Sequence, residues 1–254
     1  MVAPVLNRVP LSEIELVDLD LYGHVAEIEM LLAFAKKQGI TFATVDEDGP
    51  AEDEARLLNL AFWHPGGVAE ILDEPYLTAD QLAHNTWHVA AEAALGDGAK
   101  TIAGLLLAEA VASAFDVYLV GRLVGHHPDA PFLESQVPAM RDAALAAGRS
   151  EAEIEALVTR FVDTPEASFG ELWALLYDVS LALVRAGDAD AAATILRERR
   201  DDPLAALLHH YELPTWVLFA RAYGEGDTSP SVNAAETAIR DADDPVRWLR
   251  DHWL

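Results

Sequence analysis

Residues 78–125 decide the fold class of this chain, and they read TADQLAHNTWHVAAEAALGDGAKTIAGLLLAEAVASAFDVYLVGRLVG. Thr78, followed three residues later by Gln81, is a capping box that predicts a helix over residues 78–95. Glycines end this helix, and a second, longer helix is predicted over residues 100–124. Because the linker between them is short, we expect the two helices to form an antiparallel hairpin.

Helix signals also dominate the sequence that precedes this hairpin. Ser12 with Glu15 resembles a capping box and predicts a helix from Ser12 to Lys37, which Gly39 ends. The segment Ile40–Val45 is the one stretch with strand-like composition. A short helix is predicted over Glu52–Phe62. The N-terminal third is therefore expected to be helical apart from one strand.

Shorter helices are expected after the hairpin, because acidic or hydroxyl residues that cap helices recur there, often followed by proline. The predicted starts are Leu133, Ser150, Thr164-Pro165, Asp188, Asp202-Pro203, Pro214, Ser231 and Asp244-Pro245. The sequence thus predicts an all-α fold, a multi-helix bundle or array around the central antiparallel hairpin. We expect a single helical domain over residues 1–254, with an alternative sub-boundary near residues 125–131.

Composition limits the class of protein. The 254 residues include no cysteine, so neither disulfides nor thiolate ligands are available, and their formal net charge is −26. A field of that sign repels phosphate backbones and anionic lipids, which argues against nucleic-acid and membrane partners. The apolar run Ile102–Val124 is broken by charged residues and is expected to be a buried core helix. With no secretory signal visible, a cytoplasmic location is the default expectation.

The predicted helix over residues 78–95 carries two histidines with the spacing of a metal half-site. His84 and His88 are four residues apart, so they lie one above the other on one helix face, and Glu92 continues that stripe. Two imidazoles at this spacing suit zinc, iron, copper or nickel. A histidine pair on an alanine-rich helix also arises through ordinary packing, and both interpretations stay open.

Glu109 lies in the apolar run of the next predicted helix, where an ionised carboxylate is costly unless it is paired or bound to a metal. An antiparallel hairpin would bring it beside His84 and His88. Asp116, two turns further along the same face, could orient a histidine ligand. The alternative is that Glu109 forms a buried pair with Arg122 or with a histidine.

At these residues the chain resembles the gluzincin group of zinc peptidases, in which two helical histidines in the pattern HExxH are joined by a glutamate of a following helix. His84-Asn85-Thr86-Trp87-His88 has the histidine spacing, and Glu109 corresponds to the third ligand. The resemblance covers about 35 residues. The family's general base is a glutamate, and Asn85 stands in its place; an amide cannot take a proton from water. The resemblance therefore implies a metal site without standard peptidase activity.

These candidate residues suggest three functions, and the chemistry of the ligand set decides their order. Two histidines and one carboxylate also hold non-haem iron, so the first expectation is an iron oxygenase or oxidase that acts on a small organic substrate, with Glu92 and Asp116 as accessory residues. The second is a zinc-dependent hydrolase-like enzyme whose base, such as Glu92, comes from elsewhere. The third is a non-catalytic helical protein whose acidic face binds a basic partner.

A further alternative is a two-metal carboxylate site of the ferritin-like kind. Such sites draw glutamates and histidines from four helices and use Glu-x-x-His pairs. The first helix has the reversed order His24-Val25-Ala26-Glu27, so the di-iron pattern is not matched. The other candidate ligands for such a two-metal site are Glu92, Glu109, His209 and His210.

Overall fold

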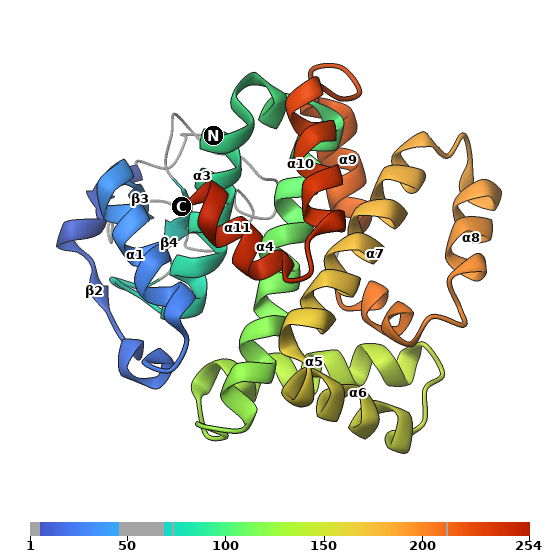
Figure 1. Ribbon diagram of the computed structural model, residues 1–254, viewed down its shortest axis with the longest axis horizontal. Helices are drawn as coiled ribbons and strands as arrows, with labels where there is room; N and C mark the ends of the chain where they lie inside the picture. Colours follow the sequence, from blue (N-terminus) through green and yellow to red (C-terminus); the bar gives the residue numbers. More distant parts are fainter. Residues whose placement is uncertain (1–5, 46–68, 73, 212) are drawn as a thin grey trace. The chain divides into compact units, whose positions relative to one another are not determined.

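The computed structural model describes residues 6–45, 69–72, 74–211 and 213–254 (Figure 1). Helices dominate these residues, as the all-α prediction required. The chain divides into two compact units, one made of residues 1–90 with Leu254 and the other of residues 91–253. The division falls within one continuous helix, α3 (Ala79–Leu95).

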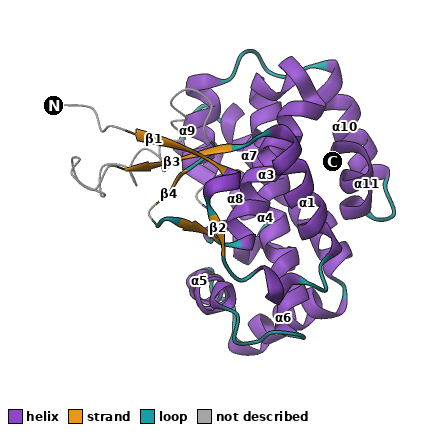
Figure 2. Cartoon of the chain, turned by 90° about the vertical axis from the view of Figure 1, so that its left-hand side faces the viewer, coloured by secondary structure: helices purple, strands orange, loops and turns teal. Residues whose placement is uncertain are grey.

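The first unit contains two small sheets (Figure 2). In one, β3 (Thr41–Val45) pairs antiparallel with β1 (Leu6–Pro10) and parallel with β4 (Ile71–Leu72). In the other, β2 (Glu15–Leu16) pairs in parallel with β5 (Tyr76–Leu77). The predicted strand at Ile40–Val45 is confirmed as β3, while the other four strands were not predicted. The predicted helix over Glu52–Phe62 lies outside the described residues.

The predicted helix from Ser12 is wrong in its first half. Residues Leu11–Glu13 form the 3-10 helix η1, β2 follows, and Leu19–Tyr22 form a second 3-10 helix, η2. The reason is that this backbone forms hydrogen bonds with a neighbouring strand instead of within a helix: the Val17 amide donates to the carbonyl of Leu77. The α-helix itself, α1 (Ala26–Gln38), ends at Gly39 as predicted. Gly39 has a φ of 64°, in the left-handed region where glycine carries no steric penalty.

One apolar cluster joins the sheets and helices of this unit. Its buried members come from η1, α1, β3, the β4–β5 segment and the first turn of α3: Leu11, Ala35, Ile40, Phe42, Leu72, Leu77 and Leu82. Burying each of the leucine, isoleucine and phenylalanine side chains of this cluster stabilises the fold by about 1.5 to 3 kcal/mol. The start of α3 is thus fixed against the strands by the same core.

The second unit is built around the apolar helix α4 (Ile102–Val124), which follows the 3-10 helix η3 (Gly96–Lys100). α4 packs mainly against α7 and also against α6 and α9 (Figure 1). The remaining elements are α5 (Pro131–Ala146), α6 (Glu151–Asp163), α7 (Pro165–Arg185), α8 (Ala189–Glu198), η4 (Pro203–His209), α9 (Leu213–Tyr223), α10 (Pro230–Asp241) and α11 (Pro245–Trp253). The two helices of the predicted hairpin are confirmed, and their antiparallel packing stays a prediction.

Local capping explains most of these helix starts. Ser150 and Glu153 form the predicted capping box of α6, and Asp188 accepts from the Ala191 amide at the start of α8. Asp202-Pro203 opens a 3-10 helix rather than an α-helix. The start predicted at Ser231 is shifted, since Ser229 caps α10 and Pro230 is its first residue. Capping chemistry therefore located starts within two residues.

Among the residues that the structure describes, two helices, α4 and α7, are long and apolar enough to cross a membrane by length and composition alone. In the structure, 78% of the apolar window of α4 and 50% of that of α7 are buried inside the protein. The burial of α4 is that of a core helix, as its sequence predicted.

Candidate metal centre

The N-terminus of α3 is held firmly one turn before the first histidine. The Thr78 amide and hydroxyl donate to Gln81 Oε1 at 3.2 and 3.0 Å, which confirms this capping pair. Asp18 Oδ1 accepts from the Ala79 amide at 2.9 Å. The first amides of a helix have no partner within the helix, so these contacts satisfy groups that would otherwise be left unpaired.

The buried face of α3 sets the rotation of the helix about its axis. Thr86 and Trp87 are fully buried, and the Thr86 hydroxyl donates to the Leu82 carbonyl at 2.6 Å. With this face directed into the protein, His84 and His88 lie on a half-buried flank.

His84 and His88 direct their Nε2 atoms toward each other. These atoms are 3.3 Å apart, and the ring centroids are 5.1 Å apart with the ring planes at 55°. Two nitrogens bound at about 2.0 to 2.1 Å to one tetrahedral ion are separated by about 3.3 to 3.4 Å. The pair therefore has the spacing of two ligands of a single metal ion. A hydrogen bond between one protonated and one unprotonated Nε2 fits the same distance.

Glu109 completes a group of three candidate ligands. One ligand atom from each of His84, His88 and Glu109 lies within 4.8 Å of the others, and all three residues are half-buried. The described residues contain no other such group of three or more histidine and carboxylate side chains. This set could hold one divalent ion and leave coordination positions open for water or substrate, as catalytic sites do.

The alternative pairing of Glu109 with Arg122 is wrong. Both residues belong to α4, where 13 residues separate them. That is about 20 Å along a helix that rises 1.5 Å per residue, and the two side chains cannot span it. Arg122 lies 3.5 Å from Glu166 of α7 and stacks over the Tyr118 ring.

Asn85, between the two histidines, is bound to a carboxylate that the sequence did not indicate. Its Nδ2 donates to Glu70 Oε2 at 2.7 Å and to the Gln81 carbonyl at 2.9 Å. Glu70 immediately precedes β4 and is half-buried. Glu70 and Asn85 are 15 positions apart and no helix contains both, so helical spacing could not have revealed this contact.

The two accessory residues predicted from sequence have different surroundings. Glu92 is exposed on α3. Asp116 lies near His210 and Tyr211, whose hydroxyl donates to the Ser113 carbonyl at 3.0 Å. Burial lowers the pKa of His210, with Asp116 opposing the shift, and burial together with Asp116 raises the pKa of Tyr211. The accessory roles of Glu92 and Asp116 stay predictions.

Except for Glu109, the candidate ligands for a di-iron site do not join this group. His24, Glu27, His209 and His210 are absent from the three-residue cluster found among the described residues. Glu27 is buried on α1, whereas His209 is exposed at the end of η4. Among the described residues, Glu109 is therefore the one di-iron candidate that belongs to the three-residue group.

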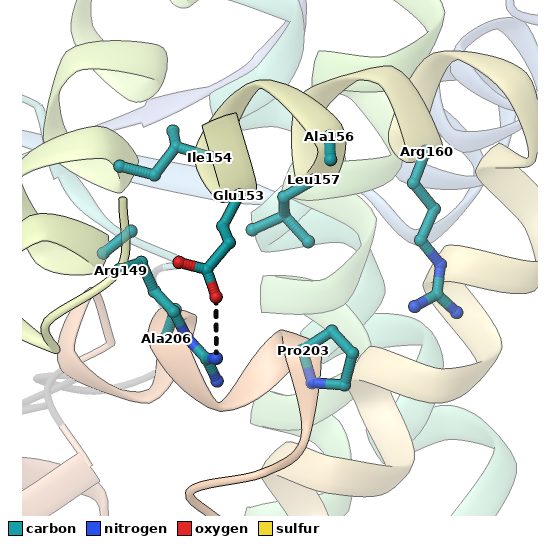
Figure 3. Close-up of a pocket in the computed structure, with 9 residues that line it drawn as sticks. Arg149, Glu153, Ile154, Ala156, Leu157, Arg160, Pro203 and Ala206 are labelled. Atoms are coloured by element: carbon teal, nitrogen blue, oxygen red, sulfur yellow. Dashed lines mark hydrogen bonds and ion pairs between the residues drawn. The ribbon is translucent and has the colours of Figure 1, made fainter. Parts of the chain in front are cut away.

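A cavity of about 350 Å³ lies in the second unit, away from these residues in sequence (Figure 3). Apolar side chains of α6 and η4 line it together with Arg149 and Arg160. Arg149 donates to the carbonyls of Arg200 and Asp202 at 2.9 and 2.8 Å, and Arg160 pairs with Glu171. Both guanidinium groups are thus engaged within the protein, and we assign no ligand to this cavity.

Comparison with protein-family models, curated proteins and solved structures finds no match to this chain. The similarity to gluzincins therefore rests on the spacing of His84 and His88 and the proximity of Glu109.

Proposed function

We propose that this protein is a metal-dependent enzyme that holds one divalent ion on His84, His88 and Glu109 and acts on a small organic substrate. The observation that carries the proposal is the 3.3 Å separation of the two Nε2 atoms, with a Glu109 oxygen within reach of both. The net charge of −26 favours a substrate other than a nucleic acid. Divalent cations, in contrast, are attracted by such a field.

Water activation by a zinc-type Lewis acid is the reaction type that these contacts favour. The sequence pointed to iron because Asn85 cannot serve as a base. Glu70 accepts a hydrogen bond from the Asn85 amide at 2.7 Å, and its carboxylate could serve as the base that Asn85 cannot provide. We therefore propose hydrolysis, or a related addition of water, as the first reaction class.

Iron with dioxygen is the second candidate. Two histidines and one carboxylate leave adjacent positions open, which is the arrangement that non-haem iron oxygenases use for dioxygen and substrate. In this case a small organic substrate would be oxidised, and Glu92 and Asp116 would act from outside the ligand set. The identity of the retained metal separates the two candidates.

Elemental analysis of protein purified without a tag under anaerobic conditions tests the proposal. We expect close to one equivalent of zinc or iron in the wild type and less than a tenth of that in His84→Ala. His252→Ala is the control, because His252 is an exposed histidine on α11 and is not one of the proposed ligands. Zinc favours the hydrolytic reaction and iron the oxidative one.

Equal metal content in all three proteins, or no metal in any of them after incubation with both ions, would contradict the proposal. In the latter case the acidic surface becomes the leading functional feature. The chain would then fit a non-catalytic helical protein that binds a basic partner.

A further inference from the structure

We propose that Glu70 is the proton acceptor of this centre and that Asn85 holds it in position. The inference rests on the proposed metal site, because it concerns a water molecule bound to that metal. It assigns a residue that lies outside the helical motif and that no spacing rule connects to it. Glu70 would take the place of the base that Asn85 cannot provide.

The hydrogen bonds of Asn85 fix the carboxylate. Asn85 is only 9% exposed, and its Nδ2 group uses both hydrogens, one toward Glu70 Oε2 and one toward the Gln81 carbonyl. The second bond ties the amide to its own helix, so the amide cannot turn without losing it. Hydrogen bonds to an ionised carboxylate are about twice as strong as neutral ones. Asn85 is therefore a positioning residue for Glu70.

The backbone of Glu70 is fixed as well. Its carbonyl accepts a hydrogen bond from the Ala43 amide of β3 at 2.9 Å, and β4 begins at the next residue. The side chain is thus anchored at the sheet on one end and at Asn85 on the other. A base held at both ends loses little conformational freedom when it acts.

Helix geometry places this carboxylate on the flank of the histidine stripe. Relative to His84, an α-helix turns by about 100° per residue, which puts His88 about 40° and Asn85 about 100° around the axis. Asn85 is therefore about 60° from His88 on the same side of α3. Asn85 therefore holds the Glu70 carboxylate on the side of α3 that carries both histidines.

Among the described residues of β3, β4 and α3, few other charged groups could accept the proton. β3 and β4 contain no titratable residue, and α3 offers only Asp80, His84, His88 and Glu92. Asp80 accepts from the Tyr22 hydroxyl at 3.4 Å, and Glu92 is exposed. The two histidines and Glu109 are the proposed ligands. Among the described residues of this region, Glu70 and Asp80 are the half-buried carboxylates outside the proposed ligand set, and Glu70 is the one bound to the residue between the two histidines.

The proposed step can be written for a simple ester. The water oxygen forms a bond to the ester carbonyl carbon while one of its protons passes to a Glu70 oxygen. The bond between this carbon and the leaving alkoxide or phenolate then breaks, and Glu70 returns the proton to the leaving group. The products are the acid and the alcohol, with no oxidant or reductant required.

Hydrolysis of p-nitrophenyl acetate by the zinc-loaded protein tests the assignment. We expect Glu70→Gln to lower kcat/KM by about 10²- to 10⁴-fold, the usual contribution of a general base, while the zinc dissociation constant stays within a few-fold of the wild type. Glu74→Gln is the matched control, because Glu74 is an exposed glutamate of the same segment. It should leave both quantities unchanged.

Two further variants separate a chemical role from a structural one. Formate should restore part of the activity of Glu70→Ala, because a small carboxylate can occupy the vacated space, and it should have no effect on Glu74→Ala. Asn85→Ala should lower kcat more than it changes KM, because it releases Glu70 without removing it. Neither result follows from a role in folding alone.

The remaining outcomes overturn the assignment in distinguishable ways. Full activity of Glu70→Gln, or loss of activity in Glu92→Gln instead, would show that Glu70 is not the acceptor. Loss of zinc from Glu70→Gln would show that Glu70 is a metal ligand and not the proton acceptor. If the zinc-loaded wild type hydrolyses the ester no faster than His84→Ala, the proposed hydrolytic step does not take place at this site. Failure of the wild type to bind zinc would refute the proposed metal site rather than Glu70 alone.

Discussion

The Nε2 atoms of His84 and His88 lie 3.3 Å apart on successive turns of α3, which is the separation of two nitrogens bound to one metal ion. Binding of an ion to the folded state alone must therefore stabilise the protein. At a free zinc concentration 100 times the dissociation constant, the gain in the free energy of unfolding is about 2.7 kcal/mol. Thermal unfolding with and without zinc should show it as a higher Tm.

His88→Ala should abolish this stabilisation and His252→Ala should preserve it, since His252 is an exposed histidine on α11. A zinc-dependent rise in Tm that persists in His88→Ala would place the bound ion elsewhere on the acidic surface. Addition of a chelator to the zinc-loaded wild type should return its Tm to the metal-free value.

Asp18 couples stability to pH through its burial near the start of α3. Burial raises its pKa from the ordinary value of 3.8; the Ala79 amide opposes this shift, and Asp20 adds to it. The folded state therefore holds the proton more tightly than the unfolded state. Stability contributed by protonated Asp18 is present below 3.8 and is lost as pH rises through the higher folded pKa. In Asp18→Asn, this component of the pH dependence of urea unfolding should disappear.

In the variant Asp18→Asn, the asparagine also tolerates the left-handed backbone of residue 18, whose φ is 60°, and its Oδ1 can still accept a hydrogen bond from the Ala79 amide. Asp18→Ala has neither property. It should lower the free energy of unfolding by about 1 to 2 kcal/mol, as the loss of a helix cap does. Equal stability of the Ala and Asn variants at pH 7 would contradict this role.

His210 should make the second unit less stable in mild acid. Burial lowers its pKa, and the partial opposition from Asp116 does not cancel that effect. The unfolded state therefore binds a proton first, so stability is complete above the ordinary value of 6.5 and is lost as pH falls through it toward the folded pKa. His210→Phe should flatten this acid-side decline in guanidinium unfolding, whereas a decline of unchanged steepness would refute the assignment.

Gly121 permits the close approach of α4 to α6. A Cβ atom at this position would lie 2.1 Å from the Phe161 carbonyl oxygen, a distance at which the backbones must separate. Gly121→Ala should therefore lower the free energy of unfolding by about 1 to 3 kcal/mol. Gly187→Ala, where no atom lies within 4 Å, is the matched control and should leave stability within about 0.5 kcal/mol. Similar losses in both variants would show that packing at Gly121 is not responsible.

The parts of the fold that were predictable from sequence are those set by local chemistry. The capping pair Thr78–Gln81, the box Ser150–Glu153 and the terminating Gly39 each specify a helix end through contacts within a few residues. The wrong helix from Ser12 shows the limit of such signals. The same hydroxyl–Glu spacing occurs there, but pairing of β2 with β5, some 60 residues away in sequence, overrides it.

The same distinction between local and long-range contacts decides which residues of the candidate site were predictable from sequence. His84 and His88 could be found because their relation is local, one turn of one helix. Glu109 was suggested by the energetic cost of a carboxylate in an apolar run. Glu70 could not be found, because its link to Asn85 depends on where the segment before β4 meets α3. The Arg122 alternative could have been rejected from sequence, by the length of the helix that separates it from Glu109.

X-ray absorption spectroscopy of the zinc-loaded protein tests the central claim most directly. The account predicts one equivalent of zinc with nitrogen and oxygen neighbours at about 2.0 to 2.1 Å and the outer-sphere scattering of two imidazole rings. In His84→Ala, scattering from one ring should be lost. A spectrum with only oxygen neighbours and no imidazole scattering would show that His84 and His88 do not bind the ion, and the proposed metal centre would be wrong.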